Sequence, residues 1–483
     1  MSRAGGSEKR GHPVRPSLIF TTLLLAALAC GGTANAEGPR WTPLTGLLAP
    51  SGTPDAATGV PTETSSTDAP TPPKAAEAVS GVGPAAPLTL KVTPGRAPTD
   101  GSPQASLGVK AVTVDADLAG ALDLGAVRGA LVTETGAAAA GGAGLIAGDI
   151  IVAIDGRAVA GSDAVTEALR DLAPGRETSV TVRRVGAGAR DLERLLVARA
   201  GAGNVGAAAS LGRFYAQGLV FGEKAPGKAA SFALQAAEGG HLASMTRYAL
   251  FAKDGIGIPK DEALAARWFR KAADGGQDAA MTNLGTLYEG GRGVTQDYAE
   301  AARWYRAAVD KGHVFAMHRL ALLYEAGRGV KKDDGEAVRL LQAASDKGLS
   351  EATSWLADKY EQGRGVPKNE EEAFRLNARV ADEVRRAAEL GNAVATFNLG
   401  ILYRAGKGVA KSDTEAASWI VKSLKLGDTY LVSELMRNPN VLSEADRKWV
   451  QEVLRDAGAY TGPIDGAFTP EVRTAMEQLG RKV

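Results

Sequence analysis

The sequence predicts a multidomain chain: a small α+β domain, an all-α helical-repeat solenoid and a small helical module at the carboxyl end, preceded by a disordered Pro/Ala-rich tether. Three observations support this prediction. Short β-branched runs gather in residues 106–200, and a motif recurs at near-regular intervals over residues 207–427. Thirteen of the 22 prolines fall in residues 37–105. At 483 residues, the chain is long enough for several buried cores.

The balance of basic and acidic residues indicates which kinds of partner the chain can bind. Lys and Arg number 56 against 55 Asp and Glu, for a formal net charge of +1. Nucleic-acid binding needs clustered positive charge, so a near-neutral chain without a long basic run excludes nucleic acid as the main partner. The chain has four His and one cysteine, Cys30, so we predict no metal site and no cofactor.

The amino-terminal segment predicts a signal peptide over residues 1–36. Basic residues precede an apolar run over residues 18–30, and Ala34-Asn35-Ala36 follows as a small-residue cleavage site before Glu37. The run has 13 residues, whereas a bilayer span takes about 20. An uncleaved anchor and lipidation at Cys30 stay open as alternatives. No later stretch is apolar enough to cross a membrane, so we expect a bacterial periplasmic or envelope protein without a transmembrane span after cleavage.

Residues 37–105 predict a disordered tether. Besides the prolines, the segment is mostly Ala, Thr, Ser and Gly, with Trp41 as its one aromatic residue. Such a composition buries too little apolar surface to offset the entropy of ordering the chain. We expect it to give the folded part reach from the export site or anchor.

Residues 106–200 predict the small α+β domain. Asp155-Gly156 follows the run IIVAI and is a strong hairpin signal, because a type I′ turn needs positive φ at both positions. Ser162 is a plausible N-cap for a helix that carries Val165, Leu169 and Leu172 on one face.

This domain resembles a PDZ domain of the HtrA protease type. The resemblance rests on SLGV (106–109) and AGLIAGDIIVAIDGRAV (143–159). It implies binding of protein C-terminal tails or extended peptides by strand addition, with a carboxylate captured by the backbone of Leu107, Gly108 and Val109. It also implies that Val165 and Leu169 line the pocket for the last side chain, although a plain core role is equally open. Gly148-Asp149 is better interpreted as a turn of the fold than as a ligand contact.

Residues 207–427 predict a helical solenoid. LGTLYEGGRGV at 284–294 recurs at 320, 356 and 399, so the offsets are 36, 36 and 43, and two degenerate copies begin at Leu211 and Tyr248. The closing glycines keep the register apart from a seven-residue insertion before Gly391. Good N-cap residues recur after the Gly-x-Gly loop, and Glu follows three residues later in four copies, which predicts capping boxes. The N-caps are Asp261, Asp297, Asp333, Asn369 and Ser412, and the glutamates are Glu300, Glu336, Glu372 and Glu415.

These units resemble Sel-one-like repeats, relatives of the tetratricopeptide repeat, and we count six. The resemblance implies a protein–protein scaffold without chemistry of its own, here binding envelope proteins. The repeated acidic residues are interpreted as caps, and His241 and His313 as structural, because each recurs at one register position. Tryptophan recurs at one position of the second helix, as Trp268, Trp304 and Trp419, and Trp355 lies outside that position. Exposure on a binding face and packing both stay open for it.

Residues 444–483 resemble the type-one peptidoglycan-binding domain. The resemblance rests on Tyr-x-Gly-Pro-Ile-Asp-Gly-x-Phe, and the family's closing Phe-Gln is absent. It implies possible peptidoglycan contact, with a cap on the solenoid as the alternative. The residues implicated are Tyr460, Gly462, Asp465, Gly466 and Phe468.

The residue inventory favours a scaffold over an enzyme. No His precedes the α+β domain in the mature chain, so a serine-protease triad has no place there. No Cys follows the leader, so an L,D-transpeptidase nucleophile is lacking too. We therefore predict a non-enzymatic envelope scaffold. A regulator of an envelope protease or sensor, and a morphogenesis or polarity factor, stay open as alternatives.

Overall fold

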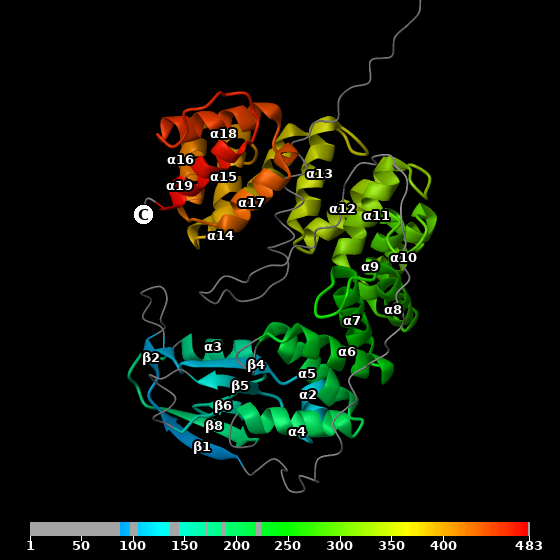
Figure 1. The fold of residues 1–483 in the computed structure, drawn as a ribbon, viewed down its shortest axis with the longest axis vertical. Helices are drawn as coiled ribbons and strands as arrows, with labels where there is room; N and C mark the ends of the chain where they lie inside the picture. The colour runs from blue at the N-terminus through cyan, green and yellow to red at the C-terminus, as the bar shows by residue number, and fades with distance from the viewer. Residues whose placement is uncertain are drawn as a thin grey trace, which may run out of the picture. The chain divides into compact units, whose positions relative to one another are not determined.

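The computed structural model describes residues 87–96, 105–135, 144–170, 172–185, 189–218 and 224–481. The predicted signal peptide, Cys30 and most of the predicted tether lie outside these ranges. The described residues divide into two compact units, one up to Asp297 and one from Tyr298 onward. Figure 1 shows the helices and strands of both units.

The first unit begins with an antiparallel sheet in the order β1-β8-β6-β5-β4, with β7 on β6 and a separate β2–β3 pair. Asp155 and Gly156 both have positive φ, 46° and 78°, which confirms the predicted hairpin turn between β6 and β7. The strands are β1 (Leu88–Val92), β2 (Gly95–Arg96), β3 (Ala105–Ser106), β4 (Val109–Thr113), β5 (Ala130–Thr135), β6 (Asp149–Ile154), β7 (Arg157–Ala158) and β8 (Thr178–Arg184).

Strands β1 and β2 correct the predicted tether of residues 37–105, which ends earlier than expected. Leu88–Val92 pairs along its whole length with β8. The reason lies in the alternation of LTLKV: Val92 is wholly buried and Leu90 partly buried against the domain core, while Lys91 is exposed. The prediction from composition missed this short strand because the segment around it is rich in proline.

Two faces of the sheet are covered by different helices. Helix α3 (Ser162–Arg170) packs on one face, where Val165 and Leu169 join the core of the domain. Helices α2 (Ala116–Ala121) and α4 (Ala189–Gly201) contribute to a second core on the other face (Figure 1). Ser162, expected as an N-cap, is the first helical residue.

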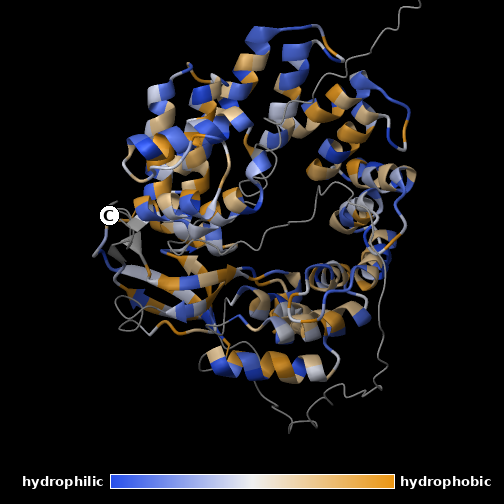
Figure 2. Ribbon diagram, turned by 45° about the horizontal axis from the view of Figure 1, so that its top comes forward, coloured by the Kyte–Doolittle hydropathy of each residue, from blue (hydrophilic) through white to orange (hydrophobic). Residues whose placement is uncertain are grey.

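The repeats form antiparallel helix pairs, as predicted, and their helices carry both hydrophilic and hydrophobic residues (Figure 2). Almost all have 13 residues, but the predicted insertion lengthens α14 to 20. In the first unit they are α5 (Val205–Gln217), α6 (Pro226–Glu238), α7 (Leu242–Asp254), α8 (Glu262–Asp274) and α9 (Asp278–Gly290). In the second unit they are α10 (Tyr298–Asp310), α11 (Val314–Ala326), α12 (Asp334–Asp346), α13 (Ser350–Gln362), α14 (Glu370–Glu389), α15 (Ala393–Ala405) and α16 (Asp413–Lys425).

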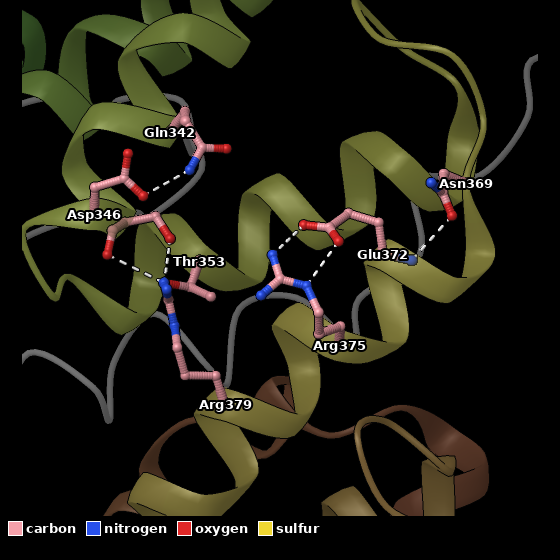
Figure 3. A network of polar contacts seen from close by, with 8 residues as sticks. Gln342, Asp346, Thr353, Asn369, Glu372, Arg375 and Arg379 are labelled. Atoms are coloured by element: carbon pink, nitrogen blue, oxygen red, sulfur yellow. Dashed lines mark hydrogen bonds and ion pairs between the residues drawn. The ribbon is translucent and has the colours of Figure 1, made fainter.

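The long helix α14 is tied to neighbouring helices through Arg379, its tenth residue. Arg379 donates a hydrogen bond to Thr353 Oγ1 at 2.7 Å and to the carbonyl of Ser345 at 3.1 Å (Figure 3). Ser345 and Thr353 also lie within hydrogen-bond distance of each other, at 2.8 Å. Arg379 therefore fastens α14 to both α12 and α13.

Four of the five predicted N-caps are confirmed, but the reciprocal half of the predicted capping box is wrong at Asp333. Asp333 Oδ1 accepts a bond from Glu336 N at 2.9 Å, and Asp261, Asn369 and Ser412 cap in the same way. The N–H of Asp333, however, donates to the carbonyl of Tyr324 in the preceding helix. Glu336 instead makes a two-bond contact with Arg339, three residues on. Tertiary contact with the preceding helix thus replaces the local bond that the box requires.

The second glycine of each Gly-x-Gly loop meets the preceding repeat at very short range. Gly329 has φ 67°, and a Cβ there would lie 2.1 Å from the carbonyl carbon of Tyr298. Gly293 shows the same approach to Glu262. Glycine is favoured at this position for two reasons. It adopts the left-handed conformation, and it lets the backbones of neighbouring repeats approach closely.

The repeat array begins half a repeat before the expected residue 207. Helix α4 ends as each second helix does: Gly203 has φ 88°, and Asn204 N donates to Arg199 O at 2.9 Å. Asn204 then caps α5 through Ala207 N. Helix α4, placed within the α+β domain by the prediction, therefore also acts as the second helix of an incomplete leading repeat.

The carboxyl-terminal module shares one core with the last repeat. Val450, Leu454 and Met476 pack in a cluster that includes Phe397 and Leu424. This cluster favours the cap that the sequence left open as an alternative. The elements are α17 (Thr429–Arg437), the 3-10 helix η3 (Pro439–Val441), α18 (Glu444–Asp456) and α19 (Pro470–Arg481).

Candidate peptide-binding groove

One edge of the sheet lies at β4. This strand pairs with β5 on one side and ends the hydrogen-bonded path of the described strands on the other. Its register shifts between Lys110 and Ala111. An edge strand presents backbone donors and acceptors that an extended peptide can pair with. This is the geometry that strand addition needs.

The loop before β4 contains the residues predicted to hold a carboxylate. Gly108 has φ 62° and turns the chain between the buried Leu107 and the half-buried Val109. Leu107 lies in the domain core with 1% exposure, so only its backbone and that of its neighbours can serve a ligand. Glycine is favoured here because it adopts the left-handed conformation without the steric cost of a Cβ.

Helix α3 borders β4, and its apolar face points into the domain. Val165 and Leu169 are 7% and 6% exposed and belong to the same core cluster as Leu107. They are thus brought together with the loop, as the sequence prediction requires. Their burial fits the core role that was left open, and the pocket role stays a prediction.

One end of the groove is closed by direct contact between its two walls. Thr113 Oγ1, at the end of β4, accepts a bond from Ser162 N at 3.0 Å and lies 3.0 Å from Ser162 Oγ. A Cβ on Gly161 would lie 2.7 Å from Thr113 Oγ1, so the walls meet closely here. We take the candidate groove to be the stretch between β4 and α3 from the Gly108 loop to this junction.

The Gly148-Asp149 turn has a structural role, as predicted. Asp149 is fully buried, accepts a bond from Ile146 N, and receives two bonds from Arg184 at 2.7 and 2.9 Å. Hydrogen bonding to Asp149 raises the pKa of Arg184. Arg184 also donates to the carbonyl of Gly144. Sequence reasoning missed Arg184, since its pairing with β6 spans 35 residues.

The residues implicated in peptidoglycan binding are engaged within their own loop. Tyr460 is 5% exposed and donates to Pro463 O at 3.0 Å, and burial raises its pKa. Asp465 accepts bonds from Ala467 N and Gln451, and the Ala467 bond is the main cause of its lowered pKa. Gly466 N donates to the fully buried Gln451.

Gly462 and Phe468, the other two residues implicated in peptidoglycan binding, also make contacts within the module. A Cβ on Gly462 would lie 2.4 Å from the Tyr460 hydroxyl, so this glycine makes room for the ring. Phe468 packs partly buried against the shared core. The loop is thus held by internal contacts, and ligand binding by its residues stays a prediction.

The three histidines of the repeats have structural surroundings. His241 caps α7 through Ser244 N, and its Nε2 lies 3.1 Å from Asp117 Oδ2. His313 precedes α11 at the same register. His318 is buried beside Trp355, with ring centroids 6.2 Å apart, and burial lowers its pKa to about 3. Trp355 is thus at least partly a packing residue.

The described ranges contain neither a candidate metal site nor a candidate membrane span. His, Cys, Asp and Glu side chains there form no group of three or more that could hold a metal ion. None of the helices in these ranges combines the length and apolar character needed to cross a bilayer.

The fold is a small sheet domain joined to a helical-repeat array, and family comparisons identify both parts. The Sel1 repeat model matches residues 205–241, 242–277, 278–313, 314–349, 350–376 and 393–428. The PDZ domain model matches residues 105–193. The chain therefore carries six Sel1 repeats and a PDZ domain. No curated protein gave a significant match.

Solved structures similar to the chain are bacterial repeat proteins. A Sel1 repeat protein from Oxalobacter formigenes is 30% identical, with 49% of this chain and 92% of that one covered and a TM-score of 0.41. The protective antigen c5321 of uropathogenic Escherichia coli is 26% identical, with 57% and 66% covered and a TM-score of 0.39. A putative Sel1 repeat protein from Klebsiella pneumoniae is 22% identical, with 44% and 99% covered and a TM-score of 0.29.

Proposed function

We propose that this protein is a non-catalytic scaffold of the bacterial envelope that captures hydrophobic C-terminal tails in its PDZ groove and holds further proteins on its Sel1 repeats. The observation that carries the proposal is the edge strand β4 beside α3, with Gly108 at its entrance. The structural engagement of His241 and His318, and the absence of cysteine after Cys30, support the non-catalytic part.

The binding test uses a fluorescent peptide that ends in a hydrophobic residue with a free carboxylate, and an amidated copy of it. We expect the full chain to bind the free acid and to lose most of its affinity for the amide. Equal binding of the two peptides would contradict carboxylate capture. Partners can then be sought by crosslinking in envelope extracts, with Val109→Glu as the comparison protein.

A point variant is the better comparison because deletion of residues 106–200 removes more than the groove. That deletion takes away α4 and apolar residues such as Leu118 and Leu196, which share a core with Phe214 of the first repeat. Loss of a partner from such a deleted protein would not separate the groove from a damaged array.

The envelope location rests on the leader pattern in residues 1–36. Amino-terminal sequencing of exported protein should begin at Glu37. A mature form that begins with acylated Cys30 would replace cleavage after Ala36 with lipoprotein anchoring. Retention of the whole leader in membrane fractions would instead favour the uncleaved anchor.

Attachment to peptidoglycan is a further part of the proposal, and it rests on the motif from Tyr460 to Phe468. The test is sedimentation with purified sacculi at moderate salt. Ala467→Arg alters an exposed loop position, and Gln478→Arg adds the same charge on the exposed side of α19. We expect only Ala467→Arg to reduce sedimentation. Equal sedimentation of both variants with the parent chain would limit the module to its capping role.

A further inference from the structure

The PDZ domain and the first repeat are joined by a specific set of contacts. Asp115, the N-cap of α2, forms an ion pair with Arg213 of α5. Asp117 contacts His241, as described above. At the other end of α2, Arg199 donates to Ala121 O at 2.6 Å. Helix α2 is therefore held at both ends by side chains of the repeat array.

Two residues of the first repeat depart from the repeat pattern at this joint. Gly206 is the second residue of α5, and a Cβ there would lie 2.7 Å from Asp117 O. Arg213 is the ninth residue of α5. The equivalent second positions hold Ala243, Ala279, Phe315, Glu351 and Val394. The equivalent ninth positions hold Leu250, Thr286, Leu322, Asp358 and Ile401.

The joint is continuous with the wall of the groove. Only Val114 separates the last residue of β4, Thr113, from Asp115, and Val114 lies in the core shared with the repeats. Within β4, Val112 packs against that shared core, whereas Val109 and Ala111 pack against the core under α3. Strand β4 is thus held between the peptide-side helix and the repeats.

We propose that Gly206 and Arg213 are positioning residues for tail binding: through Asp115, Asp117 and α2, the first repeat fixes strand β4 in its peptide-accepting place. This inference rests on the proposed tail-binding function. It makes the groove and the first repeat a single energetically coupled unit, so loosening the joint lowers tail affinity without altering any groove residue.

The test compares full-chain variants in two measurements. Arg213→Ala removes the ion pair, Arg213→Lys keeps a cation, and Gly206→Ala adds a Cβ that pushes α5 away from α2. Arg270→Ala is the matched control, because Arg270 donates to Tyr288 Oη between α8 and α9, further along the repeat array. Tail affinity is measured with the free-acid peptide, and hydrogen exchange of residues 109–113 is measured without peptide.

We expect Arg213→Ala and Gly206→Ala to weaken tail binding by about fivefold or more and to speed exchange in residues 109–113. Arg213→Lys should recover much of both, and Arg270→Ala should change neither. Unchanged exchange and affinity in Arg213→Ala and Gly206→Ala would overturn the inference. If the parent chain binds no tail, the tail-binding function fails by itself, and exchange still decides whether the joint orders β4.

Discussion

Thr113 and Ser162 join the two walls of the groove, with Thr113 Oγ1 3.0 Å from both the backbone nitrogen and the hydroxyl oxygen of Ser162. The contact sets the amino end of α3 against the carboxyl end of β4. A tail paired antiparallel to β4, with its carboxylate at Gly108, would point its upstream residues toward this junction and the nearby joint with the repeats.

Val109→Glu should weaken tail binding by about tenfold or more, because it places a negative charge beside the predicted carboxylate position. Fluorescence anisotropy with the free-acid peptide measures the change. Thr89→Glu is the control, since it adds the same charge on exposed β1 at the opposite edge of the sheet. Equal losses in the two variants would point to a general charge effect.

Gly329→Ala should destabilise the second unit by about 2 kcal/mol or more, because it adds a Cβ to a left-handed residue pressed against Tyr298. Gly335→Ala, near the start of α12, meets only Asp333 Oδ1 at 3.4 Å and should be neutral or stabilising. Urea unfolding measures both variants. A similar small effect at the two positions would contradict the close-approach argument.

Because His318 is buried, the free energy of unfolding should decrease as the pH falls. Burial lowers its native pKa to about 3, with Arg319 contributing, although Glu351 Oε2 lies 3.7 Å from Nδ1. The ordinary pKa is about 6.5, so the unfolded chain binds the proton first and stability is lost from about pH 6.5 down toward pH 3. The loss reaches about 2 kcal/mol at pH 5.

The measurement compares unfolding of the parent chain and His318→Gln at pH 7 and pH 5. Between pH 7 and pH 5, the free energy of unfolding of the parent should fall by about 2 kcal/mol more than that of His318→Gln. An equal loss in both proteins would mean that His318 titrates normally. His313→Gln is a matched control, because His313 precedes α11 and lies only partly buried.

Gln451→Ala should destabilise the carboxyl-terminal module by about 2–3 kcal/mol, because it leaves Gly466 N and Ala467 O without their buried partner. Gln478→Ala on α19 is exposed and should stay within about 0.5 kcal/mol of the parent. Thermal unfolding followed by circular dichroism compares the two. A neutral Gln451→Ala would show that the loop is held by its other contacts.

Local chemistry and repetition along the chain account for the features that sequence reasoning predicted correctly. The six repeats, the N-caps such as Asp333, and the Asp155-Gly156 hairpin turn follow from spacing and from positive-φ or capping preferences, which act within a few residues. The PDZ resemblance likewise placed Leu107, Gly108 and Val109 at the entrance of an edge strand.

Contacts between distant parts of the chain account for the features that sequence reasoning missed. Strand β1 pairs with β8, Asp149 pairs with Arg184, and the N–H of Asp333 donates to Tyr324 in the preceding helix instead of to Glu336. The joint at Arg213 and the shared core of the carboxyl-terminal module belong to the same class. Burial and partner geometry set these contacts, and no local pattern in the chain encodes which distant surface will cover a residue.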